Sequence, residues 1–365
     1  MRLSILTNMV APYRVPLFKA MAADPRIRSL RVLTCVECEV DRQWQVESDS
    51  SYTVSVLPGF TLNLKRSSDA MRIIHLRLGI FWELLRRRPD TLVIGDASWT
   101  SFMAALACKA YRVPYVVWNE ITTTSQVSKG AVAHLRRWMY RGARRLIASC
   151  SMAKDYLLQN GVPAERVYVV LNAVDNDFFL QQRERWEPKR EELRAELGVA
   201  KDAFCFIYVG QLISRKRVVE TVELLAQVAK ERPIHLLVAG TGPLESEMRT
   251  CAANYDFTAI SFCGYSKPER LSQLYVAADA LILISKDEPW GMVINEAMIF
   301  NKPFLATTSV AAAVEFYEYG YAIPYQRIIP KFVSRHINGN MVKKKYLLYH
   351  VNDMSSRFQS VLFCE

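Results

Sequence analysis

The most restrictive feature of this sequence is an alternation of short apolar runs with helical segments, which occurs twice along the chain. Short apolar runs bounded by polar turns are typical of buried strands, and helices between them supply the crossovers that parallel strands need. The first series of expected strands covers residues 3–6, 92–94, 115–118, 145–148 and 167–171. The second series covers residues 204–209, 234–239, 260–262 and 280–284. The sequence therefore predicts two α/β domains, each with a Rossmann-like, doubly wound parallel sheet.

A charged segment separates the two series. Residues 181–194 read QQRERWEPKREELR, and 365 residues suit two domains of roughly 150 to 200 residues each. We therefore expect an N-terminal domain over 1–180, a linker over 181–200 and a C-terminal domain over 201–330. In the remaining tail, 331–365, the helical pattern is weak. From the duplicated series we expect two domains that face each other across a cleft. Because such sheets bind ligands at the carboxyl ends of their strands, that cleft would hold two ligands.

The composition excludes several other classes of protein. The chain is 51% apolar and 23% charged, as in folded globular proteins, and no apolar run is long enough to cross a bilayer. Its first residues lack the pattern of a signal peptide. The net charge of +11 favours anionic partners, but no nucleic-acid-binding motif accompanies it. We expect phosphorylated small molecules or anionic lipid as partners, and no nucleic acid.

The segment with the most chemistry follows the last strand of the second series. Residues 285–298 read SKDEPWGMVINEAM, with Glu288 before an expected helix and Glu296 inside it. The N–H groups of Gly291, Met292 and Val293 form an anion site at the N-terminus of that helix. Two carboxylates beside an anion site suit a ligand that carries both phosphates and sugar hydroxyls. Taken alone, the spacing fits equally well a helix-start acid at Glu288 and a surface residue at Glu296.

Two more strand ends of the second series carry glycines or cations. Residues 210–216 read GQLISRK, which puts Arg215 and Lys216 where a diphosphate would lie at the start of the next helix. Residues 240–243 read GTGP, a tight turn in which the proline is placed to begin a helix. Three such strand ends in one sheet predict a site for a nucleotide diphosphate.

In combination these segments resemble a known family. The set Gly210 to Lys216, Gly240-x-Gly242-Pro243, Phe262-x-Gly264 and Glu288 with Glu296 is similar to the group-one, retaining glycosyltransferases of the two-domain GT-B fold. Residues 11–18 (APYRVPLF) resemble the opening of members that build bacterial surface polysaccharides, and residues 172–175 (NAVD) resemble the end of the family's first domain. The resemblance covers roughly residues 1 to 325.

The resemblance implies a role for each matching position. Lys216 would bind the donor diphosphate, Glu288 would contact the hydroxyls of the transferred sugar, and Glu296 would hold the ribose. The backbone of residues 291–293 would reach the phosphates, and Tyr265 would lie near the base. The implied donor is a UDP- or GDP-linked sugar, with no cofactor and no metal, because Lys216 and the helix N-termini stabilise the departing diphosphate. The implied acceptor is a saccharide, usually lipid-linked.

Two positions depart from the family pattern. The family usually has arginine after the first glycine, where this chain has Gln211, so one diphosphate cation is missing unless Arg215 or Arg14 replaces it. Where the first domain of the family often has histidine, this chain has Glu120. That carboxylate either orients or deprotonates an acceptor hydroxyl, or caps the Thr-rich loop after it. We also assign Tyr13 and Arg14 to contacts with the acceptor or a phosphate.

Two motifs that bind metals in other proteins lack the necessary context here. Cys35 and Cys38 form a C-x-x-C without a second pair, and the eight cysteines have the unpaired spacing of reduced thiols in the cytosol. Asp175-Asn176-Asp177 spells D-x-D, the metal signature of the other main glycosyltransferase fold, but it overlaps the end of the first domain. We therefore expect no metal site.

Two basic amphipathic stretches predict peripheral contact with an anionic membrane. Residues 71–88 (MRIIHLRLGIFWELLRRR) place Ile73, Leu76, Ile80 and Leu84 on one helical face and end in three arginines. Residues 134–145 (HLRRWMYRGARR) add five arginines. Aromatic residues beside arginines suit a headgroup region, whereas the alternative is a core-facing stripe with a solvated basic face. We expect a cytoplasmic protein at the inner face of the cytoplasmic membrane.

Two other functions remain open at the level of sequence. A nucleotide-sugar 2-epimerase would use the same fold and donor site. A catalytically impaired nucleotide-binding scaffold would explain Gln211 and the weak pattern of the tail.

Overall fold

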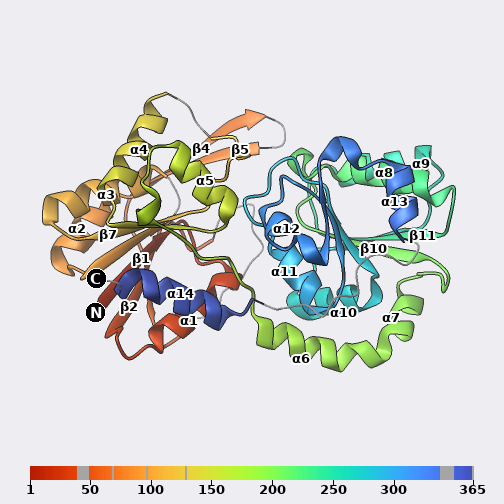
Figure 1. The fold of residues 1–365 in the computed structure, drawn as a ribbon, viewed down its shortest axis with the longest axis horizontal. Helices are drawn as coiled ribbons and strands as arrows, with labels where there is room; N and C mark the ends of the chain where they lie inside the picture. Colours follow the sequence, from red (N-terminus) through yellow and green to blue (C-terminus); the bar gives the residue numbers. More distant parts are fainter. Residues whose placement is uncertain (39–48, 68–69, 96–97, 128–129, 338–348, 364–365) are drawn as a thin grey trace. The chain divides into compact units, whose positions relative to one another are not determined.

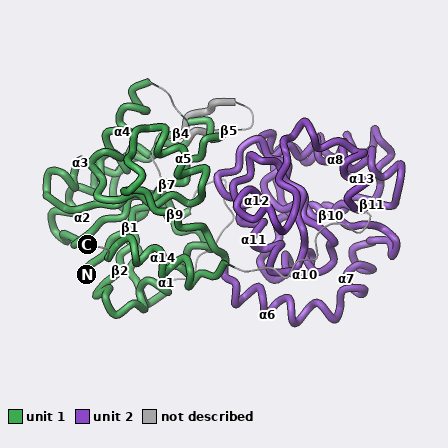
Figure 2. The backbone as a smooth tube through the Cα atoms, viewed as in Figure 1, with its two compact units in different colours: residues 1–174, 349–365 green, residues 175–348 purple. Residues whose placement is uncertain are grey.

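The computed structural model describes residues 1–38, 49–67, 70–95, 98–127, 130–337 and 349–363 (Figure 1). The chain forms two compact units, which Figure 2 colours separately. Unit 1 comprises residues 1–174 and 349–365, and unit 2 comprises residues 175–348. Among the described residues, no helix combines the length and the apolarity needed to span a bilayer.

Unit 1 is built on a seven-stranded parallel sheet with the strand order β3-β2-β1-β6-β7-β8-β9. Its strands are β1 Arg2–Thr7, β2 Ser29–Thr34, β3 Thr53–Val56, β6 Thr91–Gly95, β7 Tyr115–Asn119, β8 Arg145–Ala148 and β9 Val167–Val169. Its helices are α1 Val15–Ala22, α2 Gly79–Arg86, α3 Trp99–Tyr111, α4 Ala131–Gly142, α5 Ser151–Gln159 and α14 Val351–Phe363. An antiparallel hairpin, β4 Phe60–Ser67 with β5 Ala70–Leu76, stands apart from the sheet.

Unit 2 repeats this architecture on a six-stranded parallel sheet with the order β12-β11-β10-β13-β14-β15. Its strands are β10 Phe204–Val209, β11 Ile234–Ala239, β12 Ile260–Gly264, β13 Ala280–Leu283, β14 Phe304–Thr307 and β15 Gly320–Ile323. Its helices are α6 Asn176–Trp186, α7 Arg190–Glu196, α8 Val218–Ala229, α9 Glu245–Asn254, α10 Pro268–Ala277, α11 Met292–Ile299, α12 Ala311–Glu315 and α13 Pro330–Ile337. Helices cover both faces of each sheet (Figure 1).

The expected fold class is confirmed, because both units are Rossmann-like and doubly wound. In each sheet the strand order reverses direction once, between β1 and β6 in unit 1 and between β10 and β13 in unit 2. The central strands are buried on both faces, as β11 shows with six buried residues in succession. Such strands read as continuous apolar runs, which is why the sequence located them.

The stretch 71–88 is not one amphipathic helix, contrary to our expectation. Residues 70–76 form β5, which pairs with β4 in the register Leu62↔Ile74 and Phe60↔Leu76, and α2 begins only at Gly79. Ile80 and Leu84 are buried, whereas Trp82 and Leu85 are exposed. A partner strand satisfies the backbone of Ile73 and Ile74, whose branched side chains favour a strand, and no local pattern reveals that partner.

The second basic stretch also differs from the expectation. Of its five arginines, Arg136 and Arg145 are buried. Arg136 donates to the hydroxyl of Tyr156 at 2.9 Å, and Arg145 donates to the carbonyl of Val361 at 3.0 Å. These two guanidinium groups therefore serve packing within unit 1, and the other three remain at the surface of α4 and just after it.

The C-terminal tail carries a helical pattern that the sequence analysis missed. In α14, Met354, Phe358, Val361 and Leu362 are buried in the hydrophobic core of unit 1, and the helix lies beside α1 (Figure 1). Phe358 packs edge-to-face on Trp118 with ring centroids 5.0 Å apart. The spacing of four, three and one residues is that of a single helical face. The basic run 343–345 lies outside the described residues.

The segment that we expected to be a linker is helical. Residues 181–200 contain the end of α6 and all of α7, and both helices belong to unit 2. Arg190 and Arg194 of α7 both form ion pairs with Asp279, which precedes β13. Some of the charged side chains in this segment therefore form ion pairs that attach α7 to the sheet of unit 2.

We predict that Phe358→Ala destabilises unit 1 by about 3 to 5 kcal/mol, because it empties a fully buried site beside Trp118. Urea unfolding followed by circular dichroism measures this loss. The matched control is Leu106→Ala, which truncates a side chain that is 51% exposed in the same unit and should change stability by less than about 0.5 kcal/mol. Equal effects of the two substitutions would contradict a structural role for α14.

Candidate active site

The candidate site of unit 2 lies where the strand order of its sheet reverses. The chain proceeds from β10 to β11 and β12 on one side, then returns through β13 to the other side. Lys216 lies in the loop after β10 and Glu288 in the loop after β13, so the two flank the switch point at the carboxyl ends of the strands. Doubly wound sheets bind their ligands at this position.

Lys216 and Glu288 form an ion pair in which the ammonium donates to Oε2 of the carboxylate. Their side chains are only 12% and 13% exposed. The guanidinium of Arg215 lies 3.9 Å from the same oxygen and also donates to the carbonyl of Asp287. Residues that are 72 positions apart in the sequence are thereby brought together, as the sequence analysis anticipated.

Glycines allow the loops of this site to pack backbone against backbone. Gly240 has a φ of +155°, and a Cβ there would collide with the carbonyl oxygen of Gly210. A Cβ on Gly242 would come within 2.5 Å of the carbonyl oxygen of Leu212. The loops are also tied by hydrogen bonds from Leu212 N to Thr241 O at 2.9 Å and from Lys286 N to Arg215 O at 2.8 Å. The GTGP turn therefore supports the loop that carries Lys216.

The helix after Glu288 begins at a glycine in the left-handed region. Gly291 precedes α11 with φ +96°, and a Cβ there would press on the side chains of Val310 and Glu288 at 3.0 and 3.3 Å. Met292 and Val293 are half-exposed residues of the first turn, where backbone N–H groups have no partner within the helix. Together with the cations of the β10 loop, they provide the charge that a diphosphate needs.

Glu296 lies one turn into α11 and contacts a tyrosine that the sequence analysis did not select. The hydroxyl of Tyr275 in α10 donates to Oε2 of Glu296 at 2.8 Å. Burial raises the pKa of the Glu296 carboxyl to about 7, although the hydrogen bond from Tyr275 opposes that rise. Tyr275 lies in the last turn of α10 and belongs to no motif, so its contact with Glu296 became visible only in the folded chain.

The remaining expected donor residues lie around the same loops. Gln211 follows Gly210, and its carbonyl accepts a hydrogen bond from the buried hydroxyl of Tyr208 at 2.9 Å. Tyr265 is 43% exposed just after β12, which places an accessible ring at the carboxyl end of that strand. The next residue after Lys216 is Arg217, which has φ +52° and stacks 3.6 Å from the ring centroid of Tyr325. That contact holds the turn into α8.

Unit 1 has its own polar cluster at the carboxyl ends of its strands. Arg14 is buried, and its guanidinium donates to Thr7 Oγ1 at 2.8 Å and to Glu120 Oε2 at 2.9 Å. Asn172 donates to the other oxygen of Glu120 at 3.0 Å. The guanidinium also stacks on Trp118 at 4.5 Å, while Tyr13 is half-buried beside it. Glu120 thus joins segments after β1, β7 and β9.

The D-x-D sequence forms a helix cap. Asp175 Oδ1 accepts a hydrogen bond from the backbone N–H of Phe178 at 3.0 Å, which makes Asp175 the N-cap of α6. Within the described ranges, no cluster of three or more His, Cys, Asp or Glu side chains is arranged to hold a metal. Cys35 is buried and Cys38 exposed, and neither forms a disulfide.

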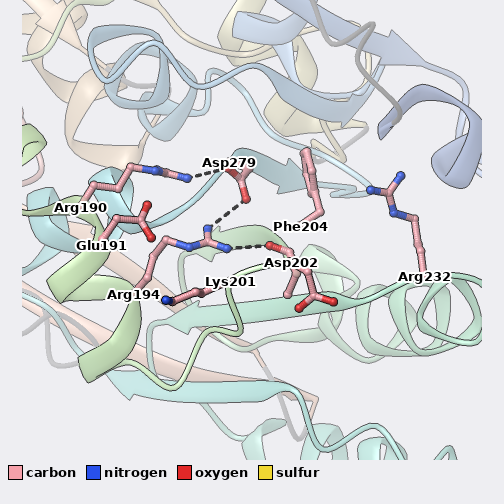
Figure 3. A pocket seen from close by; sticks show the side chains of 9 residues that line it. Arg190, Glu191, Arg194, Lys201, Asp202, Phe204, Arg232 and Asp279 are labelled. Carbon is pink, nitrogen blue, oxygen red and sulfur yellow. Dashed lines mark hydrogen bonds and ion pairs between the residues drawn. The ribbon is translucent and has the colours of Figure 1, made fainter.

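A separate polar pocket lies at the opposite edge of the unit 2 sheet (Figure 3). Its lining includes Arg190, Arg194 and Asp279, near the amino ends of β10 and β13. Arg190 donates to Asp279 at 2.6 Å, and Arg194 donates to Asp279 at 3.1 Å and to the carbonyl of Ala203 at 2.7 Å. Asp279 also accepts from the backbone N–H of Cys205 at 2.8 Å. These mutual contacts identify the pocket as part of the attachment of α7.

Comparison with known proteins agrees with this geometry. Residues 189–322 match the family model of group 1 glycosyl transferases, and residues 23–173 match that of the glycosyl transferase 4-like domain. The first match contains the loops with Lys216 and Glu288, and the two matches account for both sheets except β1 and the end of β15. Both matched segments are glycosyl transferase domains.

Individual relatives of this chain are distant. An uncharacterized glycosyltransferase of Methanocaldococcus jannaschii is 24% identical over 226 residues, which are 59% of this chain and 57% of that protein. The chain spans about half the length of the curated relatives it matches. Among solved structures, the Anabaena protein HepE in complex with UDP and glucose superimposes with a TM-score of 0.73 at 18% identity, covering all of both chains. WaaG, a glycosyltransferase involved in lipopolysaccharide biosynthesis, gives 0.72 at 14% over all of both chains. These structural likenesses establish the shared GT-B fold.

We predict that Glu120→Ala lowers the free energy of unfolding by about 3 kcal/mol, because it leaves the buried guanidinium of Arg14 without its carboxylate. Urea unfolding measures the change. In the control Lys19→Ala, which removes a 54% exposed lysine paired with Asp49, the expected loss is below about 1 kcal/mol. A loss at Glu120 as small as that of the control would show that the cluster contributes little to the fold.

Proposed function

We propose that the protein is a retaining glycosyltransferase that moves a sugar from a nucleotide-diphosphate donor to a lipid-linked saccharide acceptor in cell-surface polysaccharide synthesis. The observation that carries the proposal is the meeting of Lys216 and Glu288 beside the N-terminus of α11. An ammonium, a carboxylate and free helix N–H groups are the groups that a sugar diphosphate requires.

The proposed chemistry follows from the charges that develop when the donor is cleaved. The bond from the sugar carbon to the diphosphate oxygen breaks, which leaves an oxocarbenium-like sugar and an additional negative charge on the diphosphate. Lys216 and the first turn of α11 stabilise that charge, and Glu288 faces the sugar hydroxyls once the diphosphate occupies Lys216. Glu296 accepts hydrogen bonds from the ribose, and Tyr265 stacks near the base. The HepE complex with UDP and glucose supports a UDP-linked donor, with a GDP-linked donor as the alternative.

Two observations support a lipid-linked acceptor. WaaG, which has the same fold, is involved in the biosynthesis of lipopolysaccharide, a saccharide attached to lipid. In this chain α2 presents an apolar and basic surface, which we call the α2 surface, formed by Leu78, Trp82, Leu85, Arg86, Arg87 and Arg88. Its three apolar side chains are 57 to 58% exposed, and Arg86 stacks on Trp82 at 4.5 Å. We propose that unit 1 takes the acceptor, near Tyr13, Arg14 and Glu120, and that the protein lies at the inner face of the cytoplasmic membrane.

We predict that Lys216→Ala lowers turnover at saturating donor by at least about 30-fold, because at least about 2 kcal/mol of leaving-group stabilisation is lost. The measurement is the release of nucleotide diphosphate from a panel of UDP- and GDP-sugars. Lys230→Ala, which removes an exposed lysine just after α8, serves as the control and should leave turnover unchanged. If Lys216→Ala retained full turnover, the proposal that the diphosphate binds at this loop would be wrong.

Turnover should survive excess EDTA, since Lys216 and the first turn of α11 stabilise the leaving group without a divalent cation. The same diphosphate-release assay, run before and after chelation, measures this. If chelation abolished turnover and magnesium or manganese restored it, the metal-independent mechanism would be wrong and the donor would require a cation.

The α2 surface should bind vesicles that are rich in anionic lipid. Replacing Arg86, Arg87 and Arg88 together by Ser should weaken co-sedimentation by about two orders of magnitude, because each basic residue near an anionic surface contributes about 1 kcal/mol. Donor hydrolysis should persist in this variant, because the donor loops belong to unit 2. Trp82→Ala should weaken binding with less dependence on salt.

The matched control removes the same charge from unit 2 by changing Lys201, Lys230 and Arg249, all exposed, to Ser. This control should co-sediment as the wild type does, because the proposal assigns vesicle binding to the α2 surface. If both triple variants lost binding equally, net charge would explain the association. Wild-type protein that stayed in the supernatant at low salt would exclude the α2 surface as a membrane contact.

A further inference from the structure

The ribose-binding carboxylate proposed above has a buried partner that no motif marks. We propose that Tyr275 is a positioning residue, which holds the Glu296 carboxylate in the orientation that receives the ribose hydroxyls of the donor. This inference rests on the proposed donor site and adds to it a residue that acts through Glu296. It stands on the contact between the two side chains and on the packing that fixes the tyrosine ring.

The contact is short and enclosed. Tyr275 Oη donates to Glu296 Oε2 at 2.8 Å and lies 3.4 Å from the carbonyl oxygen of Val293, so the carboxylate is the nearer acceptor. Tyr275 is 0% exposed, and Glu296 is half-buried. With one oxygen engaged by a fixed donor, the carboxylate has a second oxygen that can accept hydrogen bonds from a ligand.

The ring of Tyr275 is held by aromatic packing that extends to α6. It stacks on Phe300, just after α11, with ring centroids 5.3 Å apart and an interplanar angle of 14°. Phe300 in turn packs edge-to-face on Phe179 of α6, with centroids 6.1 Å apart. Phe300 thus restricts the tyrosine ring and is itself held by α6, so the hydroxyl keeps a fixed position relative to α11.

The electrostatic surroundings make this one hydrogen bond important. Among the described residues, Tyr275 is the side chain that donates a hydrogen bond to the Glu296 carboxylate. Two cations bond to the ends of α11 and α10: Arg183 of α6 donates to the carbonyl of Ile299, and Lys302 donates to that of Val276. Burial raises the pKa of Glu296 to about 7, while the tyrosine hydroxyl lowers it. Without the hydroxyl, less of the carboxylate is ionised at neutral pH.

The test compares UDP affinity in wild type, Tyr275→Phe, Glu296→Gln and the double variant by calorimetry, from pH 6 to 9. Tyr275→Phe keeps the stacked ring and should weaken UDP binding about tenfold at pH 7, less at pH 9. In the Glu296→Gln background the same change should cost less than about twofold, because the partner is gone. In turnover assays, Tyr275→Phe should raise the donor KM and leave kcat within about twofold. Equal losses in both backgrounds would overturn the proposal.

The control for a lost buried hydroxyl is Tyr115→Phe, whose hydroxyl donates to the carbonyl of Met139 at 2.8 Å in unit 1. This variant should lose stability without any change in UDP affinity or in its pH profile. A shift of the UDP profile in Tyr115→Phe equal to that in Tyr275→Phe would indicate a general effect of destabilisation and would contradict the positioning role.

A second measurement needs no nucleotide. Because folding raises the pKa of Glu296 above its ordinary value of 4.5, the folded state retains a proton that the unfolded state loses, and stability falls as pH rises from 4.5 through about 7. Glu296→Gln should remove this component of the fall. In Tyr275→Phe, the fall in stability should extend to higher pH. If the stability of Tyr275→Phe and of wild type depended on pH in the same way, the contact would be refuted. If wild type bound neither UDP nor GDP, the proposed function would fail, while these profiles would still decide whether Tyr275 positions Glu296.

Discussion

The pairing of β10 with β13 is the constraint on which the proposed donor site depends. These strands are separated by about 70 residues, yet they are neighbours at the centre of the unit 2 sheet, in the register Phe206↔Ala280 and Ile207↔Leu281. Parallel pairing forces both carboxyl ends to one edge, so the loop with Lys216 and the loop with Glu288 must meet. Their backbones are also joined by the hydrogen bond from Lys286 to Arg215. The ion pair follows from this geometry.

Around that pair, backbone contacts fix the loops before any ligand enters. Gly240 and Gly242 allow the turn after β11 to lie directly on the β10 loop. Gly291 lets α11 begin beside Glu288, and the loop after β14 accepts a hydrogen bond at Ser309 from the N–H of Glu288. A site built this way is preorganised, which suits a reaction whose main requirement is stabilisation of developing charge.

Unit 1 uses the same edge of its sheet for a different arrangement. Arg14, after β1, is buried between Thr7, Glu120 and the ring of Trp118. Trp118 is in turn covered by Phe358 of α14, a helix that the chain reaches only after completing unit 2. The polar cluster of the first unit therefore depends on the last helix of the chain. The charged residues of this cluster and the core residues beneath it therefore stabilise one another.

The sequence by itself determined nine strands of the two parallel sheets, the duplication and most of the proposed donor loops, because buried parallel strands are continuous apolar runs and the motifs follow directly after them. It missed the outer strands β2, β3, β14 and β15. Tertiary structure decided the rest. Residues 70–76 became a strand because β4 supplies its hydrogen bonds, although their spacing also fits a helix. Tyr275 contacts Glu296 because α10 packs on Phe300, just after α11. The spacing of residues within either helix does not predict this contact. Likewise, only the structure shows that the apolar face of α14 is buried, because Phe358 packs on Trp118. A short periodic pattern does not indicate which surface will bury it.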